Sequence, residues 1–212
     1  MLRTSTRTRS LATLLGLGLS SLTLAACGDN GTGGNEEEVI TTVLLTFTPS
    51  GGGAAVTAAF RDADGDGGNA PTIDSIGLAA GTSYSLAVRF QNELETPAEE
   101  ITDEVRDEGD EHQVFFTGTA VSGPASNQAA APLTHTYADM DAAGLPIGLA
   151  NTIVAAGGNG DLVLTLRHMP PVNEVAVKTA QAAETVRSAG GFSTLGGATD
   201  VQVTFPVAIP VP

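Results

Sequence analysis

The chain has 212 residues, of which 42% are hydrophobic and only 4% are aromatic, with 26 glycines and 11 prolines. This length fits one domain, with or without tails. The formal net charge of −15 excludes the clustered Lys and Arg of a nucleic-acid-binding surface. Short apolar runs separated by Gly, Pro, Asp and Asn favour many short strands over a helical bundle.

The N-terminal segment has the pattern of a processing signal. Residues 1–10 contain three arginines and no acid, and residues 11–24 are Leu-rich but too short and hydroxylated to span a bilayer comfortably. We therefore expect a secretory signal peptide over residues 1–26. It is followed by Cys27, and the Leu-Ala-Ala-Cys sequence resembles the lipobox of bacterial lipoproteins. That resemblance implies a diacylglycerol on Cys27, whereas the alternative is an ordinary signal peptide followed by a free thiol.

Lipidation of Cys27 would anchor the chain to a membrane without a spanning segment. Two or three acyl chains hold a protein stably, whereas one chain gives only marginal binding. Gly28 follows the cysteine, and by resemblance to envelope sorting rules this implies the outer membrane of a Gram-negative host. Residues 27–35 are rich in Gly and Asn, so we expect a flexible tether before a single folded domain over residues 36–212.

Eight segments of the expected domain have the composition of β-strands. In one of them Leu86, Val88 and Phe90 alternate with polar residues, which is typical of a strand with one buried face. Seven to nine short antiparallel strands predict an all-β, immunoglobulin-like sandwich, and a small barrel is the alternative. The segments are 39–48, 54–60, 83–91, 113–119, 133–137, 149–155, 161–167 and 200–209.

One short helix is predicted over residues 96–108. Thr96 is a suitable N-cap, Pro97 suits the first helical position, and acids follow in the first turn. Residues 93–111 contain ten acids and a single base. Two interpretations remain open, namely a solvated helix face or a surface that attracts cations or docks a partner.

Several motifs together resemble an uncharacterised family of small envelope lipoproteins from Gram-negative bacteria. They are EEEVITTV at 36–43, DADGDGGNAP at 62–71, NELETPAEEIT at 92–102, DEHQ at 110–113, LRH at 166–168 and GGATD at 196–200. The likeness covers essentially the whole mature chain but departs around 172–191, where 178–188 has the pattern of a helical or irregular insertion. Some members are labelled as the type 1 periplasmic binding fold, a two-lobed α/β architecture, whereas the strand pattern here predicts an all-β domain. The resemblance implies no established activity.

A candidate calcium loop lies at Asp62, Asp64 and Asp66, where carboxylates stand at alternate positions before a glycine. Carboxylates in this spacing surround calcium in several loop types. Position twelve from Asp62 is Ile73, so an EF-hand is excluded, but an isolated calcium site in a turn is not. A weaker version lies at residues 139–144. The alternative is ordinary turn chemistry, in which Asp bonds to nearby backbone N–H groups.

Two histidines are candidates for a transition-metal site. His168 follows a strand whose alternate residues are all Leu, and His112 begins a strand directly after the acidic helix. Both imidazoles are therefore expected at the edge of the apolar face. With nearby carboxylates they could form a three-ligand site for zinc or copper. The carboxylates are Glu108, Asp110 and Glu111. The alternative is that each buried imidazole simply bonds to a backbone carbonyl. His135 shares its face with Leu133 and Tyr137, and packing is its expected role.

The sequence lacks several common catalytic motifs, so nothing in it supports catalysis. It has no Gly-x-Ser-x-Gly elbow, no phosphate-binding loop and no His-Glu-x-x-His helix, and the one cysteine would be acylated. We therefore expect a non-catalytic protein. The first functional hypothesis is an envelope lipoprotein that binds a metal ion or a small cationic ligand, which it could pass to an outer-membrane transporter. The alternative is a structural or adhesive surface module with calcium-stiffened loops.

Overall fold

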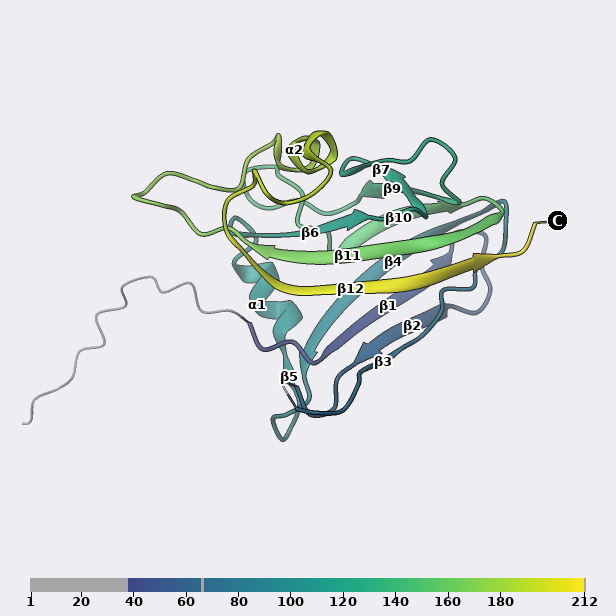
Figure 1. The fold of residues 1–212 in the computed structure, drawn as a ribbon, viewed down its shortest axis with the longest axis horizontal. Coiled ribbons are helices and arrows are strands. Elements are labelled where there is room, and N and C mark those ends of the chain that lie inside the picture. The colour runs from purple at the N-terminus through teal and green to yellow at the C-terminus, as the bar shows by residue number, and fades with distance from the viewer. Residues whose placement is uncertain (1–37, 66, 212) are drawn as a thin grey trace, which may run out of the picture. The chain divides into compact units, whose positions relative to one another are not determined.

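A computed structural model of the protein describes residues 38–65 and 67–211, and Figure 1 gives the labels of its elements. The predicted signal peptide, Cys27, the tether and Asp66 lie outside the described residues. Within them the chain forms twelve strands in two sheets and two helices. Neither described helix combines the length and the apolar character needed to cross a membrane. The all-β prediction is confirmed, and the described strands do not close into a barrel.

The larger sheet has nine strands in the order β3-β2-β1-β4-β10-β9-β7-β8, with β5 also paired to β4. All its pairs are antiparallel except β7 with β9, so the sheet is mixed, in contrast to the prediction. Four short strands were not predicted, because two or three residues carry no periodic pattern. The strands are β1 (Thr42–Pro49), β2 (Val56–Arg61), β3 (Thr72–Ile73), β4 (Thr82–Asn92), β5 (Glu99–Glu100), β7 (Val121–Gly123), β8 (Ser126–Asn127), β9 (Leu133–Tyr137) and β10 (Ala150–Ala155).

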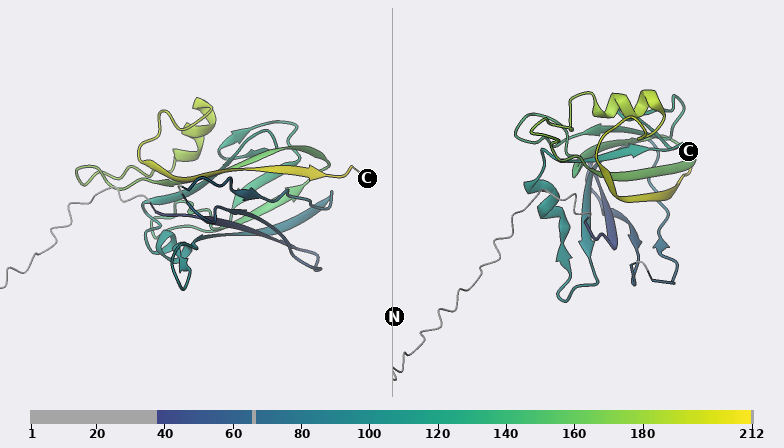
Figure 2. Two further views of the ribbon diagram at one scale, coloured as in Figure 1. Left: turned by 60° about the horizontal axis from the view of Figure 1, so that its bottom comes forward. Right: turned by 60° about the vertical axis from the view of Figure 1, so that its left-hand side comes forward.

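The smaller sheet has three antiparallel strands in the order β12-β11-β6. They are β6 (His112–Thr117), β11 (Gly158–His168) and β12 (Ala198–Ile209). The two sheets face each other across one hydrophobic core (Figure 2). Phe47 and Leu86 enter this core from the larger sheet, and Leu164 and Phe205 enter it from the smaller sheet. Burial of these alternating apolar residues is the main favourable contribution to folding.

Helix α1 (Ile101–Asp107) is shorter than the helix predicted over 96–108. Glu99 and Glu100 pair with the end of β4 as β5, so their backbone groups are not available for the first helical turn. Thr96 is therefore not the N-cap, and the helix begins at Ile101. Its buried face, with Ile101 and Val105, joins the main core, which leaves the acids of α1 facing solvent.

The hydroxyl of Thr102 fills a gap in the hydrogen bonding of β4. Its oxygen accepts a bond from the Phe90 N–H at 2.8 Å, and its single O–H proton has two acceptors within reach, the Phe90 carbonyl at 3.2 Å and the Glu100 carboxylate. Thr102→Val keeps the shape but leaves a buried N–H unpaired, and we expect it to cost about 1–3 kcal/mol. Urea denaturation measures this loss. Thr204→Val, at an exposed position of β12, should change stability by less than about 0.5 kcal/mol, and an equal loss in both variants would contradict the assignment.

A second helix, α2 (Ala182–Ala189), lies in the segment predicted as an insertion. It covers the outer face of the smaller sheet, where Ala182 and Val186 pack with Phe115 of β6 and with Met169 in a separate small core. The helical alternative for residues 178–188 is therefore confirmed, and the described residues contain this helix in addition to the one predicted over 96–108. With a core on each side, five of the six residues of β6 are buried.

Candidate functional site

His112 and His168 lie side by side at one end of the smaller sheet. They are directly opposite each other in the pairing of β6 with β11. Their rings are stacked, with centroids 4.5 Å apart and planes within 8°. His112 is 0% exposed and His168 is 7% exposed. The structure therefore brings together the two imidazoles that the sequence placed at strand ends.

Hydrogen bonds orient both imidazoles. His112 Nδ1 lies 3.3 Å from the Glu108 carbonyl oxygen, which can only accept, so Nδ1 is assigned the proton. His168 Nε2 lies 3.3 Å from Oε2 of Glu111 and is assigned as the donor in the same way. In the described part of the chain, the other nitrogen of each ring has no hydrogen-bond partner. Each ring thus retains a lone pair on a buried nitrogen.

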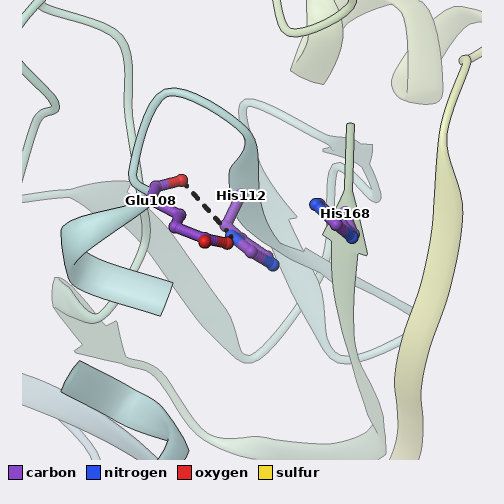
Figure 3. Close-up of side chains that lie close together, drawn as sticks. All are labelled: Glu108, His112 and His168. Atoms are coloured by element: carbon purple, nitrogen blue, oxygen red, sulfur yellow. Dashed lines mark hydrogen bonds and ion pairs between the residues drawn. The ribbon is translucent and has the colours of Figure 1, made fainter. Parts of the chain in front are cut away.

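The Glu108 carboxylate completes a group of three candidate ligands with the imidazoles (Figure 3). One ligand atom from each of Glu108, His112 and His168 lies within 4.8 Å of the others. Glu108 Oε2 is 3.8 Å from His112 Nδ1, and its side chain is 47% exposed. Of the other predicted carboxylates, Glu111 contacts His168, whereas the exposed Asp110 belongs to no such group among the described residues.

Three acids near the imidazoles were not predicted as site residues. Carboxylate oxygens of Glu38, Glu104 and Glu108 lie within 4.8 Å of one another. The Asp200 side chain is 0% exposed, and its Oδ2 lies 3.9 Å from His112 Nε2. Glu38 precedes β1 and Asp200 lies in β12, so only the tertiary fold places them beside the histidines. The sequence signal for both was their position in the EEEVITTV and GGATD motifs.

Burial and neighbouring charges shift the pKa values of this group. Burial, followed by the nearby His168, lowers the pKa of His112 to about 4, so this imidazole is neutral at pH 7. Burial, followed by Glu104 and Asp200, raises the pKa of Glu38 to about 7. The pKa of Glu108 is also raised, first by burial and then by Glu104 and Glu111. The site therefore combines a neutral imidazole with carboxylates that repel one another.

In the predicted calcium loop, Asp64 makes hydrogen bonds that are typical of an ordinary turn. Asp64 Oδ2 accepts bonds from the backbone N–H of Asn69 at 3.2 Å and from its side-chain amide at 2.8 Å. Asp62 and Asp64 line a hollow of about 600 Å³ together with Glu38 and Asp200. No group of candidate ligands among the described residues contains Asp62 or Asp64, and Asp66 lies outside them.

The weaker calcium pattern at residues 139–144 has its carboxylates engaged within the protein. Asp139 accepts bonds from three backbone N–H groups at residues 148–150. Asp141 accepts bonds from two backbone N–H groups and from the buried ammonium of Lys178. The ammonium of Lys178 thus lies in this loop, where a calcium ion was predicted. Lys178 also donates to the carbonyl of Gly109, which ties the segment before α2 to the loop that precedes His112.

His135 has the packing role that was predicted. It is 1% exposed, and its ring centroid lies 4.3 Å from that of Phe116 and 4.7 Å from that of Tyr137. Its Nε2 lies 2.9 Å from the Asn151 side-chain oxygen, which makes Nε2 the donor. Burial lowers the pKa of His135 to about 4.

Comparisons with known proteins give no match for this chain. No protein-family model matches it, and no match was found among the curated proteins or the solved structures. The functional argument therefore depends on the chemistry of the site.

Proposed function

We propose that this protein is a non-catalytic metal-binding protein, which holds zinc or copper between Glu108, His112 and His168. The observation that carries the proposal is the pair of buried imidazoles beside a carboxylate, with ligand atoms within 4.8 Å. Neutral imidazole and carboxylate are common ligands of zinc, and imidazole also suits copper. Because His112 is neutral at pH 7, no proton has to leave this ring before it binds the ion.

The partners of the rings support metal binding. Metal-binding histidines commonly donate their second ring N–H to a carbonyl or a carboxylate, which fixes the tautomer. The Glu108 carbonyl and the Glu111 carboxylate accept such bonds here. The ligand atoms of a tetrahedral zinc ion lie about 3.3 Å apart. Binding would therefore tilt the two stacked imidazoles so that their metal-binding nitrogens approach each other. Glu108 Oε2 lies beside the protonated Nδ1 of His112, so this carboxylate has to turn toward Nε2 to share the ion, and its half-exposed side chain has room to do so.

The surroundings also favour a cation. Glu38, Glu104 and Asp200 lie around the imidazoles, and an acidic surface raises the local concentration of cations. Four of these residues lie in motifs that carry the resemblance to envelope lipoproteins: Glu38, His112, His168 and Asp200. The alternative of a calcium-stiffened module has less support, because Asn69 already engages Asp64.

The proposal includes a location. The lipobox resemblance supports a lipid anchor on Cys27, and Gly28 supports the outer membrane. An anchored protein that releases its ion reversibly could supply an outer-membrane transporter. Membrane fractionation of wild type and Cys27→Ala checks the anchor, because normal membrane recovery of the variant would exclude it.

Thermal unfolding with and without zinc or copper tests the metal site. An ion that binds only the folded state should add about 2.7 kcal/mol of stability when free ion stands at a hundred times its Kd. We expect His112→Gln and His168→Gln each to abolish this gain. His135→Gln is the matched control, because it changes a buried histidine outside the site and should keep the gain. A wild type that does not respond to either metal, or a gain that survives both substitutions, would exclude the site.

A further inference from the structure

The outer edge of β12 is paired over only part of its length. β12 is an outer strand of the smaller sheet (Figure 1). Near its end, Ile76 donates to the Pro206 carbonyl at 2.8 Å and accepts a bond from the Ala208 N–H at 2.9 Å. Backbone groups of alternate residues point to the same side of a strand, and the pairing with β11 is regular from residue 201 onward. Gln202 and Thr204 therefore direct their N–H and carbonyl groups to the same side as Pro206.

This stretch of the edge is open to an added strand. Among the described residues, no backbone group bonds to the outward N–H or carbonyl groups of Gln202 and Thr204. Both residues are exposed. Proteins commonly protect such an edge with proline or lysine, but Pro206 stands where Ile76 already covers the edge. The backbone of Gln202 and Thr204 thus offers unused donors and acceptors for an extended chain.

An acidic hollow lies at the start of this edge. Its volume is about 600 Å³, and it lies between Asp200 of β12 and the residues that follow β2, with Asp62 and Asp64 in its wall. No Lys or Arg lines it within the described part of the chain. Val39 and Leu94 also line the hollow, and they are 53% and 49% exposed. Carboxylates beside apolar surface suit a lysine or arginine side chain, which has an apolar stem and a cationic head.

We propose that the open edge of β12 binds an extended segment of a partner protein, which becomes a fourth strand of the smaller sheet and places a lysine or arginine in the acidic hollow. In this mode of recognition, main-chain hydrogen bonds supply affinity and pockets for side chains supply specificity. Charge favours a basic segment over a second copy of this chain, because the formal net charge of −15 makes two copies repel each other. The surface is separate from the imidazole pair and does not depend on a bound metal.

A labelled synthetic peptide tests the proposal by fluorescence anisotropy with the full chain. The probe alternates threonine and valine and carries two lysines at one end. We expect saturable binding, which should be lost when both lysines are replaced by glutamate. Only one side of an added strand faces β12, so N-methylation of one alternate set of peptide N–H groups should abolish binding, and methylation of the other set should leave it unchanged.

Variants of the protein test the same contacts from the other side. Thr204→Pro removes an outward N–H that no described residue uses, as Pro206 does at the next outward position, and edge strands tolerate such prolines. We expect it to weaken peptide binding about fivefold, the effect of one hydrogen bond. Thr204→Ala keeps the N–H and should bind as wild type does. Asp62→Asn should weaken binding of the lysine peptide, whereas Asp161→Asn, an exposed acid near the other end of the smaller sheet, should not.

The proposal is overturned by any of three results with the peptides. They are no binding at millimolar peptide, equal effects of the two methylated sets, and equal binding of the lysine and glutamate peptides. Because these comparisons change only the peptide, they hold even if a protein variant folds poorly. A wild-type dimer in analytical ultracentrifugation that Thr204→Pro dissociates would assign the edge to a second copy and would also overturn the proposal.

Discussion

Lowering the pH from 6.5 to 4 should remove about 3 kcal/mol of metal-free stability for each of two buried histidines. Burial lowers the pKa of both His112 and His135 to about 4. Between these pH values the unfolded chain binds a proton at each imidazole and the folded chain does not. The contribution is therefore complete above pH 6.5 and is lost as the pH falls toward 4.

Titration of Glu38 changes the stability of the folded state in the opposite direction. Its pKa is raised to about 7, so the folded state takes up a proton at this carboxyl before the unfolded state does. Protonation of Glu38 therefore stabilises the folded chain as the pH falls from 7 toward 4.5. A half-buried carboxyl has a weaker effect than a buried imidazole, so we expect a net loss of stability in acid.

Denaturant unfolding in a chelating buffer at several pH values measures this loss. His135→Gln removes one of the two titrating imidazoles without touching the candidate metal site. Its stability should therefore fall by about 3 kcal/mol less than that of wild type over the same pH range. An identical pH profile for both proteins would show that His135 does not retain a depressed pKa.

Gly197→Ala should cost about 3–5 kcal/mol, because it combines backbone strain with overpacking. Gly197 has φ +83°, and a Cβ there would lie 2.1 Å from the His168 carbonyl oxygen. That oxygen belongs to the backbone of β11, so the end of the strand would have to move. The same displacement would shift the His168 imidazole, and we expect the metal-dependent stabilisation to fall with the stability.

Gly190→Ala is the matched control for this change. Gly190 also has a positive φ, of +69°, but a Cβ there meets nothing within 4 Å. Its cost should be the backbone term alone, about 1–2 kcal/mol, and metal binding should not change. Chemical denaturation and metal titration of both variants check this. Equal losses would show that the contact with His168 has no effect.

The alternation of apolar residues allowed most of the fold to be predicted. Every predicted strand is present, and Leu162, Leu164 and Leu166 are fully buried as their pattern indicated. The inward position of His168 follows from the same period of two. Short elements such as β5 were not predicted, because their pairing depends on a neighbouring strand and not on their own composition. For the same reason the start of α1 was placed too early.

The candidate site was only partly predictable, because it depends on strand pairing between distant segments. Nothing in the local sequence of His112 or His168 specifies that β6 is the neighbour of β11. The burial of Phe115 on the outer face of β6 could not be predicted either. Helix α2 buries this face, and the segment of α2 had only the pattern of a helical or irregular insertion. Asp200 has an unremarkable position in a predicted strand, and only the completed sheet brings it near His112.

The pairing of β6 with β11 also has a consequence for biosynthesis. A chain leaving the ribosome exposes His112 well before His168, so it carries a single imidazole at this site until β11 has emerged and paired. Sheets built from distant segments form slowly compared with local structure. If these histidines bind the proposed metal, loading would therefore follow synthesis and folding, and the ion available to the protein would be the one present in the compartment where folding finishes.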